Sequence, residues 1–361
     1  MDLTLDDEQQ MLADTARAFV DRSCPPEVAR ALDAGAREPN PWSVIAGAGW
    51  AGLAVPEEHG GAGRGMTEVV VVAEQLGRGP VPSPLIATTA LAALPILWLG
   101  SDEQRRRWLP ELARGTRVGT LALLEDGMRD EWDVIGVRSV PTLSGTKILV
   151  PWTSAAALML VATADGLRVV ESAPPAVCAA AHDSLGGDPL ATVVFDRADS
   201  EPLGRPEDAR AAIERAVDHA AIAQLAYTVG VAERALELSV QHASGRQQFG
   251  RPIGSFQAVA HRCADMRVDI DACRYLAYQA AWSLDQNRPA DIPVAAAKAF
   301  ANEAMRRVCR HAHQVHGAIG FSTEHDLHLF TRRAKAFELS YGSRAHHRER
   351  LACAMGLDPR P

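Results

Sequence analysis

The residues best suited to chemistry lie in one short segment, Arg246–Gln257, which reads RQQFGRPIGSFQ. Arginine carries a permanent charge and several hydrogen-bond donors, so Arg246 suits an anion such as a phosphate. Phe249 could form an apolar wall, and Gln257 could act as an amide ligand. A turn between two helices needs only glycine or proline. A plain helix hairpin with solvated arginines remains an alternative on this local evidence.

A second candidate segment, Gln314–Phe321, reads QVHGAIGF and follows a predicted helix. Glycines at this spacing would let the backbone come close to a flat or phosphorylated ligand. Gly317 could equally be the C-cap of the preceding helix, so this segment is a weaker signal than the first.

Histidines raise the question of a metal site, because ten of the twelve lie after residue 218. His313 and His316 share a helix face, but no carboxylate or cysteine completes a recognisable ligand set. We expect surface or capping roles for these histidines and no metal. The sequence also lacks the GxSxG and P-loop signatures and a GxGxxG placed after a strand, which argues against hydrolase and Rossmann functions.

Charge and composition limit the remaining function classes. The 361 residues carry a net charge of −8, which gives no reason to expect nucleic-acid binding. Residues 206–361, with 20 basic and 17 acidic side chains, are the better host for an anion. Six scattered cysteines without a CxxC pair, an acidic N-terminus and the lack of a long apolar run predict a cytoplasmic protein without membrane association.

The elements that must position these residues fall into three zones. Residues 1–118 and 206–361 show helical periodicity, and short Val-, Leu- and Thr-rich runs lie between them. We predict a mainly α protein with a small central β domain: an N-terminal helical domain (1–118), a β-barrel or sandwich (119–205) and a C-terminal four-helix bundle (206–361). The bundle would use long helices over Ala209–His242, Phe256–Leu284 and Val294–His316.

Taken together, this order and these motifs resemble the acyl-CoA dehydrogenase family along almost the whole chain. The run GWAGLAVPEEHGGAG at residues 49–63 is similar to the family's N-terminal signature, and GSDEQ at 100–104 to the run before its β domain. The two segments above match its inter-helix and glycine-spaced FAD motifs. The resemblance implies an oxidoreductase that uses FAD to introduce a double bond into an acyl-CoA thioester.

The resemblance also assigns roles to individual residues of the two segments. Arg246 would pair with the FAD pyrophosphate across a subunit interface. The adenine and ribose would be lined by two groups of residues, from the first segment Phe249, Ile253, Phe256 and Gln257, and from the second Gln314, Gly317 and Ala318. Ala318 replaces a glycine that is usual in the family.

The catalytic contacts of the family are missing from the matching positions. The family's glutamate base aligns with Tyr341, and its alternative position on the first long C-terminal helix aligns with Ala220. A phenol is a poor base at neutral pH, so we expect Tyr341 to fill space. Leu149 and Pro151 stand where the family has Trp and Thr over the flavin, and Leu124-Glu125-Asp126 stands for its Thr-Glu-Pro.

This asymmetry resembles the subunit without a base in heteromeric α2β2 acyl-CoA dehydrogenases of actinobacterial steroid degradation. A paralogous subunit would then supply the base and the flavin pocket. Two alternatives stay open: a homo-oligomeric flavoenzyme with a displaced base, for which Glu338 is the nearest carboxylate, and a flavin-free protein that binds CoA or acts as a scaffold.

Overall fold

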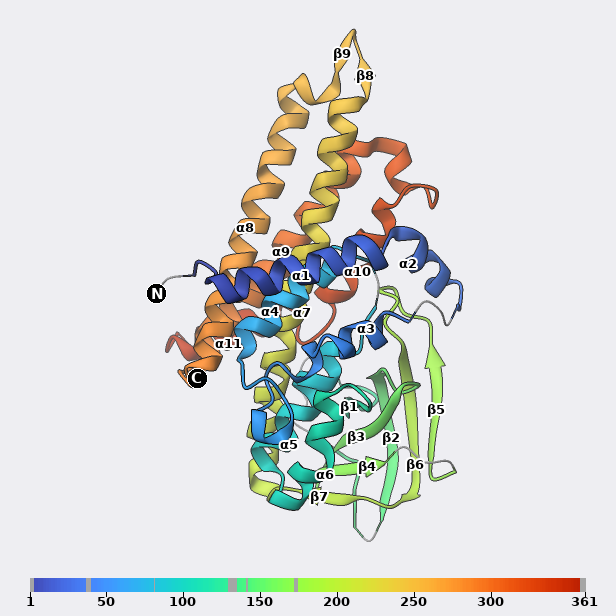
Figure 1. Cartoon of the computed structure of the whole chain (residues 1–361), viewed down its shortest axis with the longest axis vertical. Helices are drawn as coiled ribbons and strands as arrows, with labels where there is room; N and C mark the ends of the chain where they lie inside the picture. Colours follow the sequence, from blue (N-terminus) through green and yellow to red (C-terminus); the bar gives the residue numbers. More distant parts are fainter. Residues whose placement is uncertain are drawn as a thin grey trace. The chain divides into compact units, whose positions relative to one another are not determined.

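The computed structural model describes residues 3–36, 40–80, 82–128, 135–140, 142–171 and 175–357. The chain divides into two compact units (Figure 1). The mixed unit contains residues Asn40–Val69 and Pro82–Ala220, and the helical unit contains Met1–Pro39, Val70–Val81 and Ala221–Pro361. Helices α4 (Met66–Gly77) and α7 (Pro206–Gly245) contribute residues to both units.

Seven strands of the mixed unit form two sheets within the described residues. One sheet has the order β1-β3-β4-β7, with β1 and β3 parallel and the other pairs antiparallel, and the second has the antiparallel order β2-β6-β5. The strands are β1 (Val118–Ala122), β2 (Leu143–Pro151), β3 (Ala156–Thr163), β4 (Gly166–Glu171), β5 (Val177–His182), β6 (Leu190–Ala198) and β7 (Glu201–Leu203).

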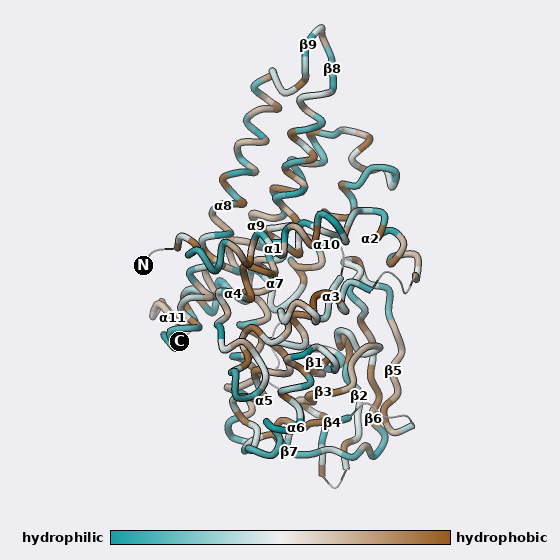
Figure 2. The backbone as a smooth tube through the Cα atoms, viewed as in Figure 1, coloured by the Kyte–Doolittle hydropathy of each residue, from teal (hydrophilic) through white to brown (hydrophobic). Residues whose placement is uncertain are grey.

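The two sheets share one apolar core. Met159 and Val161 of β3 are fully buried in the same cluster as Val193 and Phe195 of β6. Hydrophobic segments along β2, β5 and β6 are visible in Figure 2. Two sheets that bury one core between them form a sandwich, which is the architecture predicted for the middle of the chain.

Local signals explain the helices of the mixed unit, which are α3 (Pro41–Gly47), the 3₁₀ turns η1 (Trp50–Gly52) and η2 (Glu57–His59), the π-helical segment η3 (Ala87–Ala93), α5 (Leu94–Leu99) and α6 (Asp102–Ala113). Helix α6 begins with a capping box, in which Ser101 Oγ accepts from the Gln104 amide at 3.2 Å. Segment η3 precedes Pro95, which cannot donate a backbone hydrogen bond, and a widened helical turn there was not predicted.

The helical unit also contains α1 (Asp7–Ser23), α2 (Pro26–Asp33), β8 (Gln247–Gln248), β9 (Arg251–Pro252), the 3₁₀ turns η4 (Ile253–Ser255) and η5 (Gly317–Phe321), α8 (Gln257–Asp285), α9 (Asp291–His316), α10 (Leu327–Glu338) and α11 (Arg344–Ala354). Helix α9 packs against α8, α10 and α11. Ala301 and Met305 of α9 are buried, so this helix forms the centre of the bundle.

Helices α4 and α7 approach each other closely within the helical unit. A Cβ at Gly77 would lie 1.8 Å from the Tyr227 carbonyl oxygen, and a Cβ at Gly230 would lie 1.9 Å from the Glu74 carbonyl oxygen. Any side chain at either position would force the backbones apart. The carboxylate of Glu74 is buried beside them and binds Arg274 Nε at 2.9 Å.

The fold class predicted from the sequence is confirmed, with helical segments on both sides of a small β domain along the chain. The proposed boundaries near residues 118 and 205 fall at the start of β1 and between β7 and α7. Strand β5 was not predicted, because its sequence VCAAAH is rich in alanine and lacks a clear alternating pattern.

Candidate functional site

The segment Arg246–Gln257 forms a hairpin at the tip of the α7–α8 pair (Figure 1). Strands β8 and β9 pair antiparallel, which makes Phe249 and Gly250 the two central residues of the turn. Their φ angles are 53° and 77°, as a two-residue type I′ turn requires. Phe249 is 91% exposed, so the chain holds a large aromatic ring outside at a strained backbone position.

Backbone and ring contacts fix the rest of the hairpin tip. The Ile253 amide donates to the Arg246 carbonyl oxygen at 2.9 Å, which closes the turn while the Arg246 side chain stays exposed. The Arg251 guanidinium lies 4.1 Å from the centroid of the Phe256 ring. The Phe249 ring meets Phe256 edge-on, with centroids 6.1 Å apart. The tip therefore presents cations and aromatic surface together.

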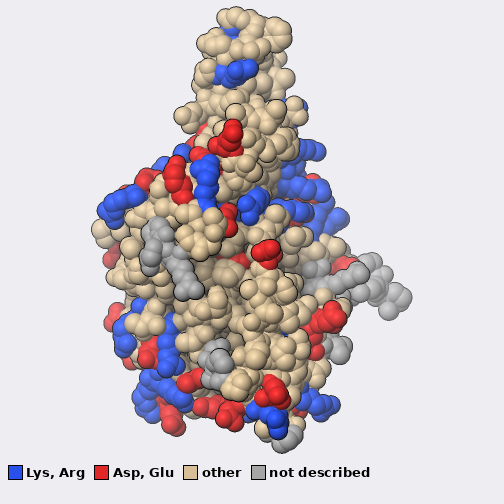
Figure 3. Space-filling model, turned by 90° about the vertical axis from the view of Figure 1, so that its right-hand side faces the viewer, with Lys and Arg blue, Asp and Glu red and all other residues tan. Residues whose placement is uncertain are grey.

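The hairpin carries positive charge without acidic neighbours along the chain. Residues 238–264 contain Arg246, Arg251 and Arg262 and no aspartate or glutamate. In Figure 3 the upper end of the molecule shows blue basic side chains with red acidic ones only lower down. An anion would be attracted by these arginines at the tip.

The second predicted segment lies where α9 ends. Gln314, Gly317 and Ala318 are exposed, and Gly317 has a positive φ of 64° as the C-cap of α9. A Cβ at Gly317 would meet nothing within 4 Å, so the backbone here borders open space. Gly317 therefore ends the helix and also leaves its own backbone approachable.

Three histidines join the two segments. The rings of His242 on α7 and His316 on α9 stack with centroids 4.8 Å apart, and His325 meets His316 edge-on at 4.7 Å. We call these three residues the histidine stack. His242 lies one turn before Arg246, whose amide binds the His242 carbonyl oxygen at 2.9 Å, and His316 directly precedes Gly317. The structure thus brings the base of the hairpin next to the end of α9.

Backbone contacts define which nitrogens of the stack carry hydrogen. His316 Nδ1 lies 2.8 Å from the Ala312 carbonyl oxygen, so this nitrogen must donate, and Nε2 of the neutral ring is an acceptor. Nε2 of His316 is buried without a hydrogen-bond partner among the described residues. His325 Nδ1 accepts from the Leu327 amide at 3.1 Å, so Nε2 of His325 carries the hydrogen.

Two members of the stack, His242 and His316, have lowered pKa values. Burial lowers the pKa of His316, and the neighbouring rings of His325 and His242 lower it further. Burial also lowers the pKa of His242, with smaller contributions from His325 and Arg246. His316 is only 5% exposed, so it is no surface histidine, but its ring binds the Ala312 carbonyl oxygen in the last turn of α9 as a capping residue would.

Tyr341 lies in the connection between α10 and α11, half-buried and with a positive φ of 54°. Buried side chains bind three consecutive carbonyl oxygens around it. Lys298 Nζ donates to Ser340 at 2.8 Å, His347 Nε2 to Tyr341 at 2.8 Å, and Asn302 Nδ2 to Gly342 at 3.3 Å. These bonds offset the strain of the left-handed tyrosine and fix its backbone.

The buried environment of this connection excludes extra atoms and charge. Burial lowers the pKa of His347 to about 3, so this histidine is neutral at pH 7. A Cβ at Gly342 would lie 2.6 Å from His347 Nε2, and Gly342 has a φ of 98°. Glycine is therefore required at this position both by conformation and by space.

Two carboxylates lie in the sequence near the positions that align with the base of the acyl-CoA dehydrogenase family, and both already have partners within the chain. Ala220 is fully buried in α7, and Asp218, two residues earlier, is buried and has its own interaction within the chain. Glu338 forms an ion pair with Lys335 at 2.9 Å. Neither Tyr341 nor Ala220 offers a carboxylate.

In the mixed unit, the residues at the positions of the family's flavin contacts are exposed or have partners within the chain. Leu149 is 48% exposed with a positive φ of 51°, and the Pro151 carbonyl oxygen accepts from Thr120 at 2.7 Å. Glu125 binds the fully buried Lys147 at 2.6 Å. Burial would raise the pKa of Glu125, but hydrogen bonds from Lys147 and from two backbone amides lower it overall.

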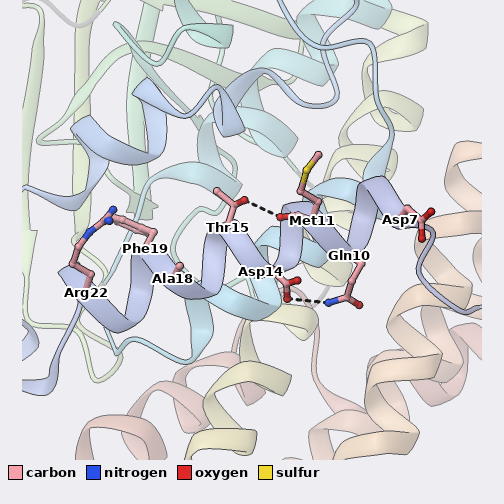
Figure 4. A pocket seen from close by; sticks show the side chains of 8 residues that line it. All are labelled: Asp7, Gln10, Met11, Asp14, Thr15, Ala18, Phe19 and Arg22. Atoms are coloured by element: carbon pink, nitrogen blue, oxygen red, sulfur yellow. Dashed lines mark hydrogen bonds between the residues drawn. The ribbon is translucent and has the colours of Figure 1, made fainter.

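Other features of the described residues do not assemble comparable chemistry. A shallow hollow on α1 is lined by residues of this single helix, in which Gln10 binds Asp14 at 3.0 Å (Figure 4). No group of three or more His, Cys, Asp or Glu is placed to hold a metal ion in the part of the chain that the structure describes. Within the same residues, no helix is both long and apolar enough to span a membrane.

Sequence reasoning missed the histidine stack and the three side chains that bind the Ser340–Gly342 carbonyls. His316 lies inside a predicted motif, but nothing in the sequence indicates that His242 packs on it. Lys298 gave a usable signal. It is one of three lysines in the chain and lies among alanines of a predicted core helix, where an unpaired charge would be costly.

Comparisons with known proteins agree with this architecture. Residues 6–116 match the model of the acyl-CoA dehydrogenase N-terminal domain, and residues 210–356 match that of the acyl-CoA dehydrogenase C-terminal domain. The acyl-CoA dehydrogenase IpdE2 of Mycobacterium tuberculosis is 35% identical over 92% of both chains. The chain therefore belongs to the acyl-CoA dehydrogenase family.

Solved structures show the same fold. Butyryl-CoA dehydrogenase from Megasphaera elsdenii superposes with a TM-score of 0.91 at 25% identity, over 98% of this chain and 100% of that one. A chain of the ChsE4–ChsE5 complex from M. tuberculosis superposes with a TM-score of 0.89 at 30% identity, over 100% of both chains.

Proposed function

We propose that the chain is a subunit of an FAD-dependent acyl-CoA dehydrogenase and that it binds the ADP end of FAD across a subunit interface. The observation that carries this proposal is the hairpin tip, where Arg246 and Phe249 are exposed at a shaped turn. Family membership supports the dehydrogenase chemistry. When bound, FAD would accept the hydride that leaves the β-carbon of the acyl thioester.

The exposed residues of the two segments fit the ADP half of FAD. Arg246 can donate to the diphosphate, and Phe249 offers an open ring face to the adenine. Gln257 and Gln314 provide exposed amides for the ribose or adenine edge. Gly317 borders open space, so the backbone at the end of α9 can approach the ligand. Ile253, Phe256 and Ala318 would complete this surface.

The described residues at the family's base positions, Tyr341 and Ala220, carry no carboxylate that could accept the proton. Removal of an α-proton from a thioester needs a positioned base with its reacting atom in a dry site. Tyr341 has its backbone bound on both sides, and Glu338 is ion-paired with Lys335. We therefore propose that the base comes from a paralogous subunit of an α2β2 assembly and that Tyr341 fills space.

Similarity to a chain that was solved as the ChsE4–ChsE5 complex favours this heteromeric arrangement over a homo-oligomer with a displaced base. The hairpin tip argues against a flavin-free scaffold. A scaffold would have no reason to keep an exposed phenylalanine and two arginines at a turn that glycine and polar residues could form.

The experiment compares the chain purified alone with the chain co-expressed with a paralogue that has the glutamate base. Alone, we expect an absorbance spectrum with little or no flavin. In the co-expressed complex we expect bound FAD and acyl-CoA dehydrogenation. Arg246→Ala in that complex should remove FAD without unfolding the helical bundle, because a diphosphate contact is worth about 2–5 kcal/mol.

Arg17→Ala, which removes an exposed arginine of α1, is the matched control and should retain FAD. Stoichiometric flavin in the isolated chain would overturn the heteromeric proposal. Unchanged flavin in the Arg246→Ala complex would overturn the assignment of the hairpin.

A further inference from the structure

The histidine stack has a property that the proposed function does not use. It contains one bare nitrogen, Nε2 of His316, which is buried and has no partner among the described residues. A buried acceptor without a hydrogen bond costs free energy. A proton could occupy this nitrogen only if a nearby negative charge compensated the burial of the cation.

The groups that act on the stack are an arginine and other histidines. Arg246, which directly follows α7, acts on His242, and His313 acts on His316 from α9. His328 on α10 donates to the His325 carbonyl oxygen at 2.7 Å. Asp326 follows His325, but its carboxylate already binds Arg30 of α2. These surroundings favour the neutral rings of His242 and His316 in the absence of a bound anion.

A diphosphate bound at its proposed position would be such an anion. His242 precedes Arg246 by one helical turn, and His316 directly precedes Gly317, so the stack lies beneath both segments of the nucleotide site. A diphosphate at this corner would place negative charge next to the stack and would favour its protonated form.

We propose that the His242–His316–His325 stack is the proton-accepting part of the nucleotide site, and that a diphosphate bound beside Arg246 draws one proton onto it. Binding at this corner then grows tighter as the pH falls. This inference rests on the proposed function, because it needs the nucleotide to bind at the hairpin.

The test uses the isolated full-length chain and ADP-ribose, whose diphosphate is esterified on both sides and does not titrate near neutral pH. Binding is measured by calorimetry at about pH 8 and about pH 5.5, in two buffers with different ionisation enthalpies. We expect the affinity to rise about tenfold towards the lower pH, with uptake of about one proton per ligand.

Two variants separate the stack from other titrating groups. His316→Asn places an amide donor near the Ala312 carbonyl oxygen but removes the titrating ring, and His242→Gln alters the half-buried member. Each should bind ADP-ribose with an affinity that changes by less than about twofold over the same pH range. His182→Gln on the exposed strand β5 is the control and should keep the full pH dependence.

The outcomes distinguish this inference from the function on which it rests. ADP-ribose binding by the wild type with no pH dependence would overturn the role of the stack and leave the nucleotide site standing. The same pH dependence in folded His242→Gln and His316→Asn would also overturn it. No binding by the wild type at any pH would overturn the role of the stack, whereas bound FAD in the co-expressed complex would leave the proposed function standing.

Discussion

The hairpin tip and the Tyr341 connection are two irregular segments at positions where the sequence resembles the family's FAD motif and its base segment, and they differ in how they are held. At the tip, Phe249 and Gly250 take positive φ angles while their side-chain positions face open space. At the connection, Tyr341 and Gly342 also take positive φ angles, but three buried donors bind the surrounding carbonyls.

This difference fits the proposed function. The tip holds Phe249 and Gly250 at strained backbone positions and leaves most of the Phe249 ring exposed. The connection has its backbone fixed by buried donors, and Tyr341 at its centre has no carboxylate. Under the proposed function, the tip meets the ligand and the connection serves internal stability.

The largest expected effect comes from Lys298→Met. The substitution removes the fully buried ammonium that donates to the carbonyl oxygens of Phe337 and Ser340, and both oxygens lose this donor. We expect the free energy of unfolding to fall by about 4 kcal/mol, measured by urea denaturation.

Lys335→Met is the matched control for this measurement. Lys335 is 47% exposed and pairs with Glu338 within one helical turn, so its loss should cost under about 0.5 kcal/mol. Equal losses from the two lysine variants would contradict the view that buried donors fix the connection.

Smaller losses of stability are expected from alanine at Gly342 and at Gly250, and the two losses should differ. Gly342→Ala would place a Cβ 2.6 Å from His347 Nε2 at a φ of 98°, and should cost about 2–3 kcal/mol. Gly250→Ala at the tip carries only the penalty of its φ of 77°, since nothing lies within 4 Å, and should cost about 1 kcal/mol. Thermal unfolding of the two variants measures the difference. A larger loss at Gly250 would reverse the comparison.

The smallest effect is expected from Tyr341→Phe in the co-expressed complex. The variant keeps the ring and the backbone carbonyl that accepts from His347, so turnover should change by less than about twofold. Replacement of the paralogue's glutamate is the positive control and should abolish turnover. A loss of about a hundredfold or more in Tyr341→Phe, with flavin retained, would show that the phenol takes part in the chemistry.

The sequence predicted the helices well because their apolar periodicity is strong. Helix α9 was expected over Val294–His316 and observed over Asp291–His316. The prediction from the sequence failed where the local preference for helix or strand is weak or contrary. Strand β5 is mostly alanine, and its pairing with β6 depends on the neighbouring strand rather than on its own residues.

For the candidate site, the sequence supplied the residue types and the structure supplied their neighbours. The spacing of Arg246, Phe249 and Gln257 was informative because a bare turn does not need those side chains. The contact between His242 and His316 depends on how α7 packs beside α9, which no local pattern encodes. The bond from Lys298 to the Tyr341 connection joins residues 42 apart in the sequence, so no local pattern encodes it either.

The scarcity of lysine in this arginine-rich chain makes amine chemistry unusually selective. Lys147 in the mixed unit and Lys298 in the helical unit are both fully buried, while Lys335 is half exposed. An amine-acylating reagent should therefore modify Lys335 in the folded chain and reach the other two only through opening. Because each buried lysine belongs to a different unit, peptide mass spectrometry after brief labelling would report the opening of each unit separately.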